Sequence, residues 1–509
     1  VSDNQNRPSL KKSITGFIVC FALMFGEAFI LHYLNLQRHD SMYVFLLPSV
    51  YFLFNILLYI KGKSHKKLRR ISLIIYIIHP LMIVVVRLFS KLVHMQDLLI
   101  ENSLIHYIVV CFISVVFAIF MTALWRRLKP EQAKHIVATE RAYLEIDLNN
   151  LEHNVSVLKK AIPKDCELMA VVKAEAYGHG TYEIATHINK IGVKAFAVAT
   201  IDEGITLRKY GITGEILILG YTAPERAKEL CKYSLIQTLI DYEYSIRLNN
   251  QGYKVNAHIK IDTGMHRLGF DKEDVESIAT VFSLKNIKVC GIYTHLCASD
   301  SIDEKDVSFT NMQIESFYKL LRLIKEKGIA IPKIHIQSSY GFLNYPELKC
   351  NYVRTGVALY GVLSSPNDKV KLQLDLRPVL SLKARVILLR QIKTGDCVGY
   401  SRSFVADRDS RIAILSIGYA DGYPRILSCG KSYVLINGHQ APVVGKICMD
   451  LLAVDVTDCP DVTVGSIATL IGNDGNEEIS APTVADNSES ITNELLSRMG
   501  RRLKVIHKD

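Results

Sequence analysis

The feature that most constrains this fold is a series of eight short apolar runs, separated by stretches with helical patterning. The runs are rich in Val and Ile, and they cover Leu168–Lys173, Phe196–Ala199, Ile216–Leu219, Ile236–Leu239, Ala257–Ile261, Lys288–Thr294, Lys333–Gln337 and Tyr352–Val357. Strands that alternate with helices form parallel sheets whose faces the helices cover. Eight such units predict a (β/α)8 barrel, and a doubly wound open sheet is the structural alternative.

The first 130 residues differ from the rest, because they carry four apolar stretches near the ~20 residues that a bilayer-spanning helix needs. The stretches are Ile14–Leu34, Met42–Ile60, Ile71–Val93 and Ser103–Trp125. Glu27 interrupts the first, and His79, Pro80 and Arg87 interrupt the third. A signal peptide does not explain four runs in succession. The sequence therefore predicts about four transmembrane helices.

Basic residues flank these stretches unevenly, which sets the orientation of membrane helices. Lys and Arg gather at 7–12, 61–70 and 126–134, whereas the two other connections hold few. This pattern predicts a multi-pass membrane protein with everything after Trp125 in the cytoplasm. The stretch IIYIIHPLMI resembles the late helices of integral-membrane acyltransferases, but no catalytic histidine motif of those enzymes is present. No acyl transfer is expected.

From Ser381 onward the chain changes to short strands with turn residues between them, as in GHQAPVVGKICMDLLAVDVTD. This pattern predicts a separate, mostly β domain. The strand Tyr143–Leu148 precedes the barrel, and its assignment to the β domain instead stays open. The predicted parts are a transmembrane region over 1–135, a barrel over 136–375 and a C-terminal β domain over 376–509.

Composition excludes several classes of protein. Of the 509 residues 49% are hydrophobic and 22% charged, which excludes a disordered chain. The formal net charge is +11, but much of the basic surplus flanks the apolar stretches, so nucleic acid is not an expected partner. The 11 cysteines form no C-x-x-C pair and no cluster with zinc spacing, so reduced thiols and no metal site are expected.

Residues with catalytic chemistry follow the ends of the eight runs, where barrels of this kind place their active sites. Lys173 ends the first run, and burial there lowers the pKa of a lysine and frees its amine to react with carbonyl groups. The others are Arg267 after the fifth run, His295 after the sixth, Ser339 after the seventh, and Arg354, Gly356 and Val357 in the eighth. Taken singly, each has a structural alternative, such as a surface charge, a loop salt bridge, a core histidine or a turn cap.

Six segments together resemble the alanine racemase family, which uses pyridoxal 5'-phosphate. They are AVVKAEAYGHG, KIDTGMHRLGF, THLCASD, RTGVALYG, SIGYADGYPR and GKICMD. The resemblance extends from Arg141 to about Val505. It implies cofactor attachment at Lys173, phosphate binding by Tyr177 and Ser339 with the backbone of Gly356 and Val357, ring packing by His295, and a contact between Arg354 and the pyridine nitrogen.

The resemblance also implies the roles around the substrate. Tyr419 is the second catalytic base, and Arg267 with the backbone around Met449 orients the substrate carboxylate. Lys260 lies seven residues before Arg267, where family members often carry a carbamylated lysine, and an uncarbamylated lysine in a salt bridge is the alternative. In this family the second base comes from the other subunit, so a homodimer is implied.

The chemistry explains these residue types. Racemisation removes a proton from one face of Cα and delivers one to the other face, so two bases are needed. Lys173 serves one face and Tyr419 the other, and cationic neighbours must activate the tyrosine, whose free pKa is ~10. The cofactor supplies the electron sink. Arg354 is always charged and only donates hydrogen bonds, so it disfavours protonation of the pyridine nitrogen.

Three positions depart from the family pattern, and one of them concerns the substrate. Glu175 and Ser338 stand where the family has Asn. Near the C-terminus the family commonly reads INYE, with the tyrosine lining the active site, whereas this chain reads ITNELL with Asn493 at that place. Asn is smaller and carries both a donor and an acceptor. It leaves room for a larger side chain and suits the hydroxyl that distinguishes serine from alanine.

A racemase-like part joined to membrane helices resembles the membrane-bound serine/alanine racemases of vancomycin-resistance systems. The expected function is interconversion of L- and D-serine, together with L- and D-alanine, which supplies D-serine for modified peptidoglycan precursors. The alternatives are an alanine racemase for ordinary peptidoglycan and a membrane transport or sensor protein whose barrel merely binds pyridoxal phosphate. The retained pair of Lys173 and Tyr419 argues against the last.

Overall fold

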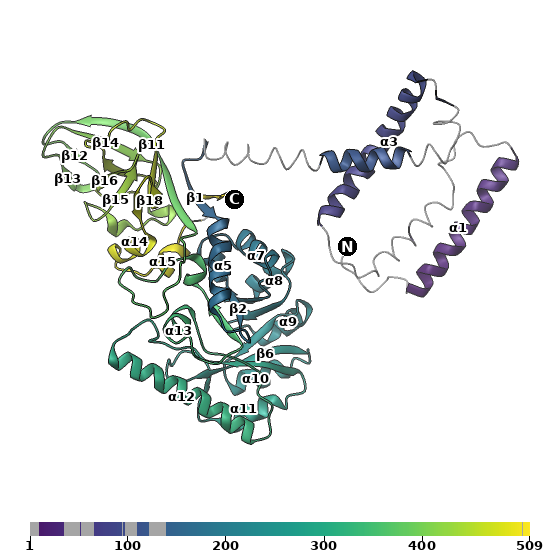
Figure 1. Cartoon of the computed structure of the whole chain (residues 1–509), viewed down its shortest axis with the longest axis horizontal. Coiled ribbons are helices and arrows are strands. Elements are labelled where there is room, and N and C mark those ends of the chain that lie inside the picture. The colour runs from purple at the N-terminus through teal and green to yellow at the C-terminus, as the bar shows by residue number, and fades with distance from the viewer. Residues whose placement is uncertain are drawn as a thin grey trace. The chain divides into compact units, whose positions relative to one another are not determined.

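The computed structural model describes residues 10–34, 51, 66–93, 95–96, 109–121, 139–500 and 502–508. The chain divides into two compact units between Lys129 and Pro130. Figure 1 shows the helical N-terminal unit in purple and blue, and the larger unit in teal, green and yellow. Each unit is described separately.

Within its described residues, the N-terminal unit contains two long helices, α1 (Leu10–Tyr33) and α3 (Lys66–Leu92), and residues 109–121 are also helical. Pro80 lies inside α3. Among the described residues of this unit, no helix combines the length and the apolar character that crossing a membrane requires. The four predicted transmembrane helices are therefore not confirmed. Most of the second predicted stretch, both ends of the fourth, and most of the basic flanks lie outside the described residues.

Eight parallel strands of the larger unit close into a barrel. They are β2 (Glu167–Val171), β3 (Ala195–Val198), β4 (Glu215–Ile218), β5 (Ile236–Leu239), β6 (Val255–Asp262), β8 (Ile287–Tyr293), β9 (Lys333–His335) and β10 (Tyr352–Thr355). β10 pairs with β2, and the other strands follow in chain order to β9. The amide of Arg354 donates to the carbonyl of Gln337 at 3.2 Å, which joins β10 to the end of β9. This closure excludes the open doubly wound sheet, and each predicted run matches one strand to within two residues at either end.

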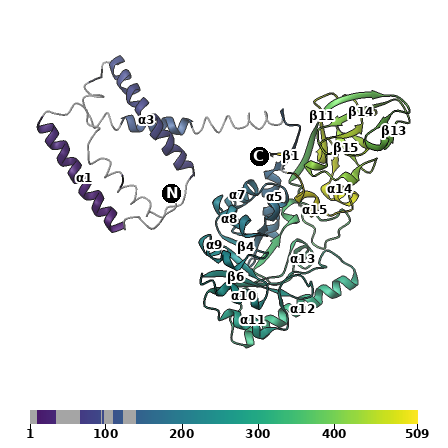
Figure 2. The ribbon, with the colours of Figure 1, turned by 180° about the vertical axis from the view of Figure 1, so that it is seen from behind.

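Helices cover the outside of the barrel (Figures 1 and 2). Those around the barrel are α5 (Leu148–Ala161), α6 (Lys173–Tyr177), α7 (Thr181–Lys190), α8 (Ile201–Lys209), α9 (Ala227–Lys232), α10 (Tyr242–Asn249), α11 (Val275–Phe282), α12 (Glu304–Glu326) and α13 (Ser339–Asn344), with the short turns η3 (Pro224–Arg226) and η4 (Val357–Tyr360) and the two-residue strand β7 (Phe270–Asp271) beside β6. Several begin at a capping side chain: Asp147 accepts from the amide of Asn150 at α5, and Asp241 from that of Tyr244 at α10. Such caps satisfy amides that the first helical turn leaves without partners.

Some strands, such as β2, carry apolar side chains on both faces, because the barrel has an inner and an outer core. Along β2, Leu168 and Ala170 pack in the large core between strands and helices, whereas Met169 and Val171 pack in a smaller separate cluster. Alternate residues of a strand point to opposite faces, which accounts for this division. The continuous apolar runs in the sequence follow from it.

The C-terminal part is a nine-stranded sheet in the order β19-β18-β15-β16-β17-β14-β11-β1-β20. Its strands are β1 (Ala142–Asp147), β11 (Leu380–Ile392), β14 (Ser410–Leu415), β15 (Tyr433–Ile436), β16 (His439–Val444), β17 (Leu452–Asp455), β18 (Ile467–Asp474), β19 (Glu477–Ile479) and β20 (Lys504–Lys508). β1 pairs antiparallel with β11 and parallel with β20, so the strand that precedes the barrel belongs to this sheet. The predicted, mostly β domain is confirmed. The remaining elements are the ribbon β12 (Cys397–Val398) and β13 (Phe404–Val405), the turns η5 (Tyr400–Arg402), η6 (Tyr419–Asp421) and η7 (Arg425–Leu427), and the helices α14 (Ala481–Asn487) and α15 (Thr492–Ser497).

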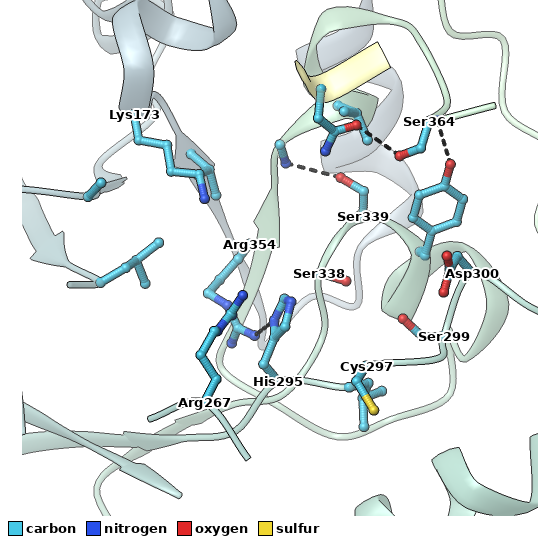
Figure 3. A pocket seen from close by; sticks show the side chains of 18 of the residues that line it. Lys173, Arg267, His295, Cys297, Ser299, Asp300, Ser338, Ser339, Arg354 and Ser364 are labelled. Carbon is cyan, nitrogen blue, oxygen red and sulfur yellow. Dashed lines mark hydrogen bonds between the residues drawn. The ribbon is translucent and has the colours of Figure 1, made fainter. Parts of the chain in front are cut away.

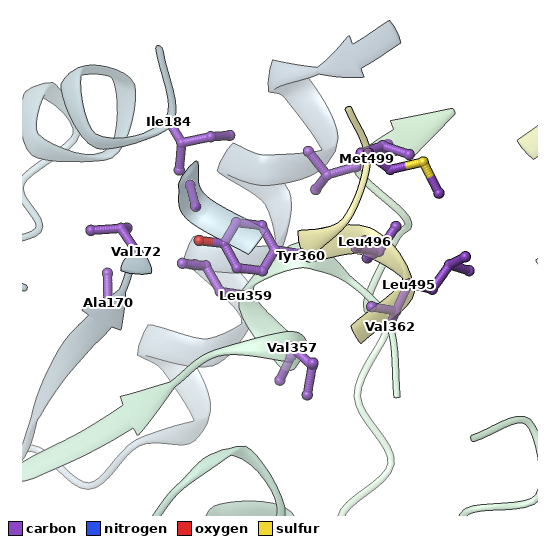
Figure 4. Packing of buried hydrophobic residues seen from close by; sticks show 14 of the residues in the cluster. Ala170, Val172, Ile184, Val357, Leu359, Tyr360, Val362, Leu495, Leu496 and Met499 are labelled. Atoms are coloured by element: carbon purple, nitrogen blue, oxygen red, sulfur yellow. The ribbon is translucent and has the colours of Figure 1, made fainter. Parts of the chain in front are cut away.

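Helix α15 joins the C-terminal part to the barrel. Its Leu495 and Leu496 are buried and lie beside Tyr360 and Val362 of the barrel (Figure 4). A Cβ atom at Gly178 would lie 2.1 Å from the carbonyl oxygen of Leu496, so only glycine permits this approach of the two backbones. The packing fixes the position of the first turn of α15 beside the barrel.

Candidate active site

A cavity of about 460 Å³ opens where the barrel strands end, at their C-terminal side. Ten of the residues predicted from sequence line it: Lys173, Tyr177, Lys260, Arg267, His295, Ser339, Arg354, Gly356, Val357 and Asn493. Figure 3 shows Lys173 on one side of this cavity, with Ser339 and Ser364 on another. The predicted Tyr419 and Met449 are not among its lining residues.

Lys173 is directed into the cavity by an unusual turn that begins just after β2. Residues 174–177 all have φ between 51° and 54°, a left-handed conformation that costs L-residues about 1–2 kcal/mol each. A carboxylate outside the turn helps to hold it, because Glu203 accepts hydrogen bonds from the amides of Ala174 and Ala199, both at 2.7 Å. Burial, together with the charge of Arg267, lowers the pKa of Lys173. The amine is therefore more readily neutral than that of an exposed lysine.

A small polar cradle lies at the ends of β9 and β10. The Ser339 hydroxyl oxygen accepts from the amides of Gly356 at 3.0 Å and Ala358 at 3.4 Å. A Cβ atom at Gly356 would lie 2.6 Å from the Tyr177 hydroxyl oxygen, so glycine makes room for this hydroxyl. Burial raises the pKa of Tyr177 to about 12, which keeps it protonated as a donor. Hydroxyls and amides converging in this way suit a phosphate group.

The two positions with Ser or Glu in place of Asn have local roles. Ser338 caps α13, where its hydroxyl accepts from the amide of Gly341 at 3.4 Å. The Glu175 carboxylate accepts from the amide of Thr181 at 3.4 Å, across the end of the left-handed turn. Of the two, only Ser338 lines the cavity.

A buried chain of rings leads away from Arg354, whose side chain lies inside the barrel. Its guanidinium donates to Nδ1 of His335 at 2.8 Å and to Nδ1 of His295 at 3.2 Å, and His335 Nε2 lies 2.9 Å from Nδ1 of His258. Because arginine only donates, both Nδ1 atoms that it contacts must accept, which places the proton of His335 on Nε2. His335 then donates to His258. The tautomers of this chain follow from the arginine.

Burial keeps these rings neutral. It lowers the pKa of His258 to about 4 and those of His295 and His335 well below the usual range. The positive charge of Arg354 acts in the same direction on all three. Burial also lowers the pKa of Arg354 to about 10, which leaves it charged at neutral pH. The Arg354 guanidinium is therefore a fixed cation backed by neutral imidazoles.

Lys260 is a buried amine inside the barrel, on β6. Its Nζ lies 6.0 Å from the ring centroid of Tyr293. Burial, followed by the charges of Arg267 and Arg354, lowers its pKa to about 8. In the part of the chain that the structure describes, Lys260 has no ion-pair partner, so the salt-bridge alternative receives no support.

Tyr419 and Met449 lie together on the surface of the C-terminal domain. The amide of Tyr419 donates to the carbonyl of Cys448 at 3.1 Å, and that of Ala420 donates to the carbonyl of Met449 at 3.0 Å. Both side chains are exposed, at 40% and 53%. The family resemblance implies that the second base comes from the other subunit, and within one chain neither Tyr419 nor Met449 lines the cavity.

Several residues of the cavity wall were missed in the sequence. Cys297, Asp300, Tyr340 and Ser364 all line it. Cys297 and Asp300 stand within THLCASD, and Tyr340 directly follows Ser339, so proximity to recognised motifs was an available signal. For Ser364 the only signal in the sequence was its position shortly after the eighth strand.

Comparison with known proteins decides the family. The alanine racemase N-terminal domain matches residues 146–364, and the alanine racemase C-terminal domain matches residues 379–507. An amino-acid racemase from Enterococcus faecalis is 61% identical over 509 residues, which cover 100% of this chain and 71% of that protein. The chain belongs to the alanine racemase family. It is thus a pyridoxal-phosphate-dependent amino-acid racemase, as the six sequence segments predicted.

Other members of the alanine racemase family agree with this assignment. A serine/alanine racemase from Enterococcus gallinarum is 36% identical over 508 residues, covering 99% of this chain and 70% of that protein. The solved structure of an alanine racemase from E. faecalis superimposes with a TM-score of 0.67 at 32% identity, covering 72% of this chain and 98% of that one. An acyltransferase domain matches residues 1–123, which confirms the likeness seen in IIYIIHPLMI.

Proposed function

We propose that this racemase interconverts L- and D-serine as well as L- and D-alanine. The observation that carries the proposal is Asn493, whose carboxamide lines the cavity and offers polar atoms to a substrate side chain. A tyrosine at this place would fill the space and face the substrate with a ring. The likeness to a serine/alanine racemase from E. gallinarum supports the same substrate range.

The cavity fits pyridoxal phosphate. Its phosphate suits the polar cradle that is formed by Ser339, Tyr177 and the amides of Gly356 and Val357. Glycine at 356 leaves room for the Tyr177 hydroxyl in this cradle, because a Cβ atom there would obstruct it. Lys173 would supply a half-buried amine of lowered pKa to its aldehyde. Arg354 would serve as a donor to its ring nitrogen, and His295, which accepts a hydrogen bond from Arg354, would pack against its ring. When bound, the cofactor supplies an electron sink that acidifies the Cα proton of the substrate.

The chain's own residues then handle the protons and the carboxylate. The neutral Lys173 amine takes or returns a proton at one face of Cα. Arg267, an exposed cation at the cavity wall, attracts the substrate carboxylate. Arg354 cannot accept a proton, so beside the ring nitrogen of a bound cofactor it would limit protonation there. His335 and His258 keep that guanidinium in place.

The second base requires a second copy of the chain. Tyr419 is exposed and lies outside the cavity of its own chain, beside Met449. We therefore propose a homodimer in which Tyr419 and Met449 of one copy complete the site of the other. Closed twofold dimers are the commonest oligomers and present the same pair of surfaces twice.

Carbamylation of Lys260 belongs to the same proposal. A neutral amine adds to CO2 and releases a proton, and the lowered pKa of Lys260 makes the neutral form accessible near pH 8. The carbamate would carry a negative charge between Arg267 and Arg354, the two cations that now lower the pKa of the amine. Mass spectrometry of the native protein, with and without bicarbonate, tests for the added mass of one CO2, about 44 Da.

We further propose a role in supplying D-serine for modified peptidoglycan precursors, as in vancomycin resistance. The alternative is an alanine racemase for ordinary peptidoglycan. For residues 1–135 we propose membrane association with the racemase part on the cytoplasmic side, supported by the apolar stretches, the basic flanks and the match to an acyltransferase domain.

The decisive experiment compares L-serine and L-alanine side by side as substrates of the purified chain loaded with pyridoxal phosphate. Chiral chromatography follows the appearance of each D-isomer. Values of kcat/KM for serine within about tenfold of those for alanine, a difference of about 1.4 kcal/mol, support the proposal. Racemisation of alanine alone contradicts it and favours the ordinary alanine racemase.

A further inference from the structure

We propose that Ser364 is a specificity-positioning residue, which holds the Asn493 carboxamide so that its NH2 group faces the substrate side chain as a hydrogen-bond donor. The inference rests on the proposed function and assigns the group that would recognise a side-chain hydroxyl. Ser364 itself touches no reacting atom, and it acts through Asn493.

The direct observation is a hydrogen bond at the cavity wall. The Ser364 hydroxyl donates to Oδ1 of Asn493 at 2.9 Å, and both residues line the cavity (Figure 3). This contact occupies the carboxamide oxygen. The NH2 group has no hydrogen-bond partner among the described residues, so its two protons remain available to a ligand.

Ser364 can act in this way because its own backbone is fixed from two sides. Its amide donates to the Tyr340 hydroxyl at 2.5 Å, and that hydroxyl in turn bonds to the carboxylate of Asp368. Its carbonyl accepts from the amide of Thr492 at 2.9 Å and from the Thr492 hydroxyl at 3.0 Å. Ser364 therefore links the barrel directly to the first turn of α15.

The seating of α15 leaves Asn493 little freedom other than rotation of its side chain. Thr492, Leu495 and Leu496 are buried around it, and the close approach at Gly178 holds the backbone of the helix. A carboxamide has two orientations of nearly equal shape that exchange donor and acceptor. In the structure the Ser364 hydroxyl donates to the oxygen, and this contact holds the carboxamide in the orientation that leaves the NH2 group to a ligand.

The consequence for substrate choice is chemical. A serine side chain ends in a hydroxyl oxygen that accepts from the NH2 group, whereas the alanine methyl group gains nothing from it. A net hydrogen bond in a protein changes an equilibrium by roughly two- to tenfold. Removing the Ser364 hydroxyl is therefore expected to lower the ratio of kcat/KM for serine to that for alanine by this factor.

The test measures this ratio for the full chain loaded with cofactor. The variants are Ser364→Ala, Ser364→Val, Ser364→Thr, Asn493→Ala and the double variant Ser364→Ala with Asn493→Ala. Ser364→Ala and Ser364→Val should lower the ratio, and Ser364→Thr, which has the shape of valine but keeps a hydroxyl, should restore it. In the Asn493→Ala background the loss of the Ser364 hydroxyl should leave the ratio unchanged. Ser365→Ala is the matched control, because this neighbouring serine does not line the cavity.

Each outcome decides between the possibilities. A purely structural role of Ser364 would lower both kcat/KM values together, with no rescue by Ser364→Thr, and would overturn the inference. An equal fall of the ratio in the Asn493→Ala background would also overturn it. If Ser364→Ala fails to bind cofactor, the comparison of Ser364→Val with Ser364→Thr carries the test. A wild-type chain that racemises alanine but not serine refutes the proposed function, and the positioning role with it, whereas serine activity with an unchanged ratio refutes the positioning role alone.

Discussion

The substitution Gly356→Ala tests the phosphate cradle through a single methyl group. The added Cβ would lie 2.6 Å from the Tyr177 hydroxyl oxygen and 3.1 Å from the ring carbon that bears it. Ordinary contacts between carbon and oxygen need more than 3 Å, so one partner must move by several tenths of an ångström. The tyrosine is half-buried and packs against Tyr360 with ring centroids 5.3 Å apart, which limits its retreat.

The size of the effect follows from overpacking. Extra methyl groups in a well-packed site cost about 1–3 kcal/mol, which corresponds to roughly five- to 150-fold in an equilibrium constant. The cost appears in cofactor affinity, because the displaced groups are the Tyr177 hydroxyl and the Gly356 amide. We therefore expect Gly356→Ala to weaken the binding of pyridoxal phosphate by a factor in this range.

The assay titrates the apoprotein with pyridoxal phosphate and follows the absorbance of the bound cofactor. Tyr177→Phe provides the matched comparison, since it removes the hydroxyl that the methyl group meets. Combining it with Gly356→Ala should cost less than the sum of the two single changes. Wild-type affinity in Gly356→Ala, with unchanged thermal stability, would refute the assignment of this cradle to the phosphate.

Four further predictions concern other parts of the molecule. Lys173→Ala should abolish both the visible absorbance of the bound cofactor and racemase activity, and a variant that retains both would contradict its role. Asn493→Tyr should lower kcat/KM for L-serine more than for L-alanine, by the ~0.5–1.5 kcal/mol of a hydrogen bond plus a steric cost, and an unchanged ratio would place specificity elsewhere. The pKa of His258 is ~6.5 in the unfolded chain and about 4 in the folded protein. The stability that neutral His258 contributes is therefore complete above pH 6.5 and is lost as the pH falls toward 4. The substitution His258→Gln should flatten this part of the profile of Tm against pH. A reporter fused after Asp509 should be active only if it is a type that works in the cytoplasm, and labelling of that end from outside intact cells would contradict the orientation.

The barrel was predictable because burial imposes a simple pattern on its strands. A strand such as β3 is buried along its whole length, so all four residues of Ala195–Val198 are apolar, and the predicted run Phe196–Ala199 is displaced from it by one residue. The Gly178–Leu496 approach and the short helix α15 were not predictable in this way. They depend on two segments far apart in the chain, and neither carries a periodic pattern of its own.

The residues of the site also differ in whether the sequence alone could reveal them. Lys173, Ser339 and Arg354 were found because they lie at strand ends within motifs. Ser364 was missed because its meaning arises only when α15 returns to the barrel and brings Asn493, 129 residues further along, to its hydroxyl. Tyr419 was found by motif, but a motif does not state which copy of the chain completes a site.

The most direct test of the whole account mixes two inactive variants. Lys173→Ala and Tyr419→Phe each lack one of the two bases, and each purified alone should be inactive. If each site combines Lys173 of one copy with Tyr419 of the other, subunit exchange creates mixed dimers with one intact site, and random exchange should restore about a quarter of wild-type activity. If both bases of a site come from the same chain, no mixture contains an intact site. Absence of activity in a mixture whose heterodimers are verified by mass would contradict the account.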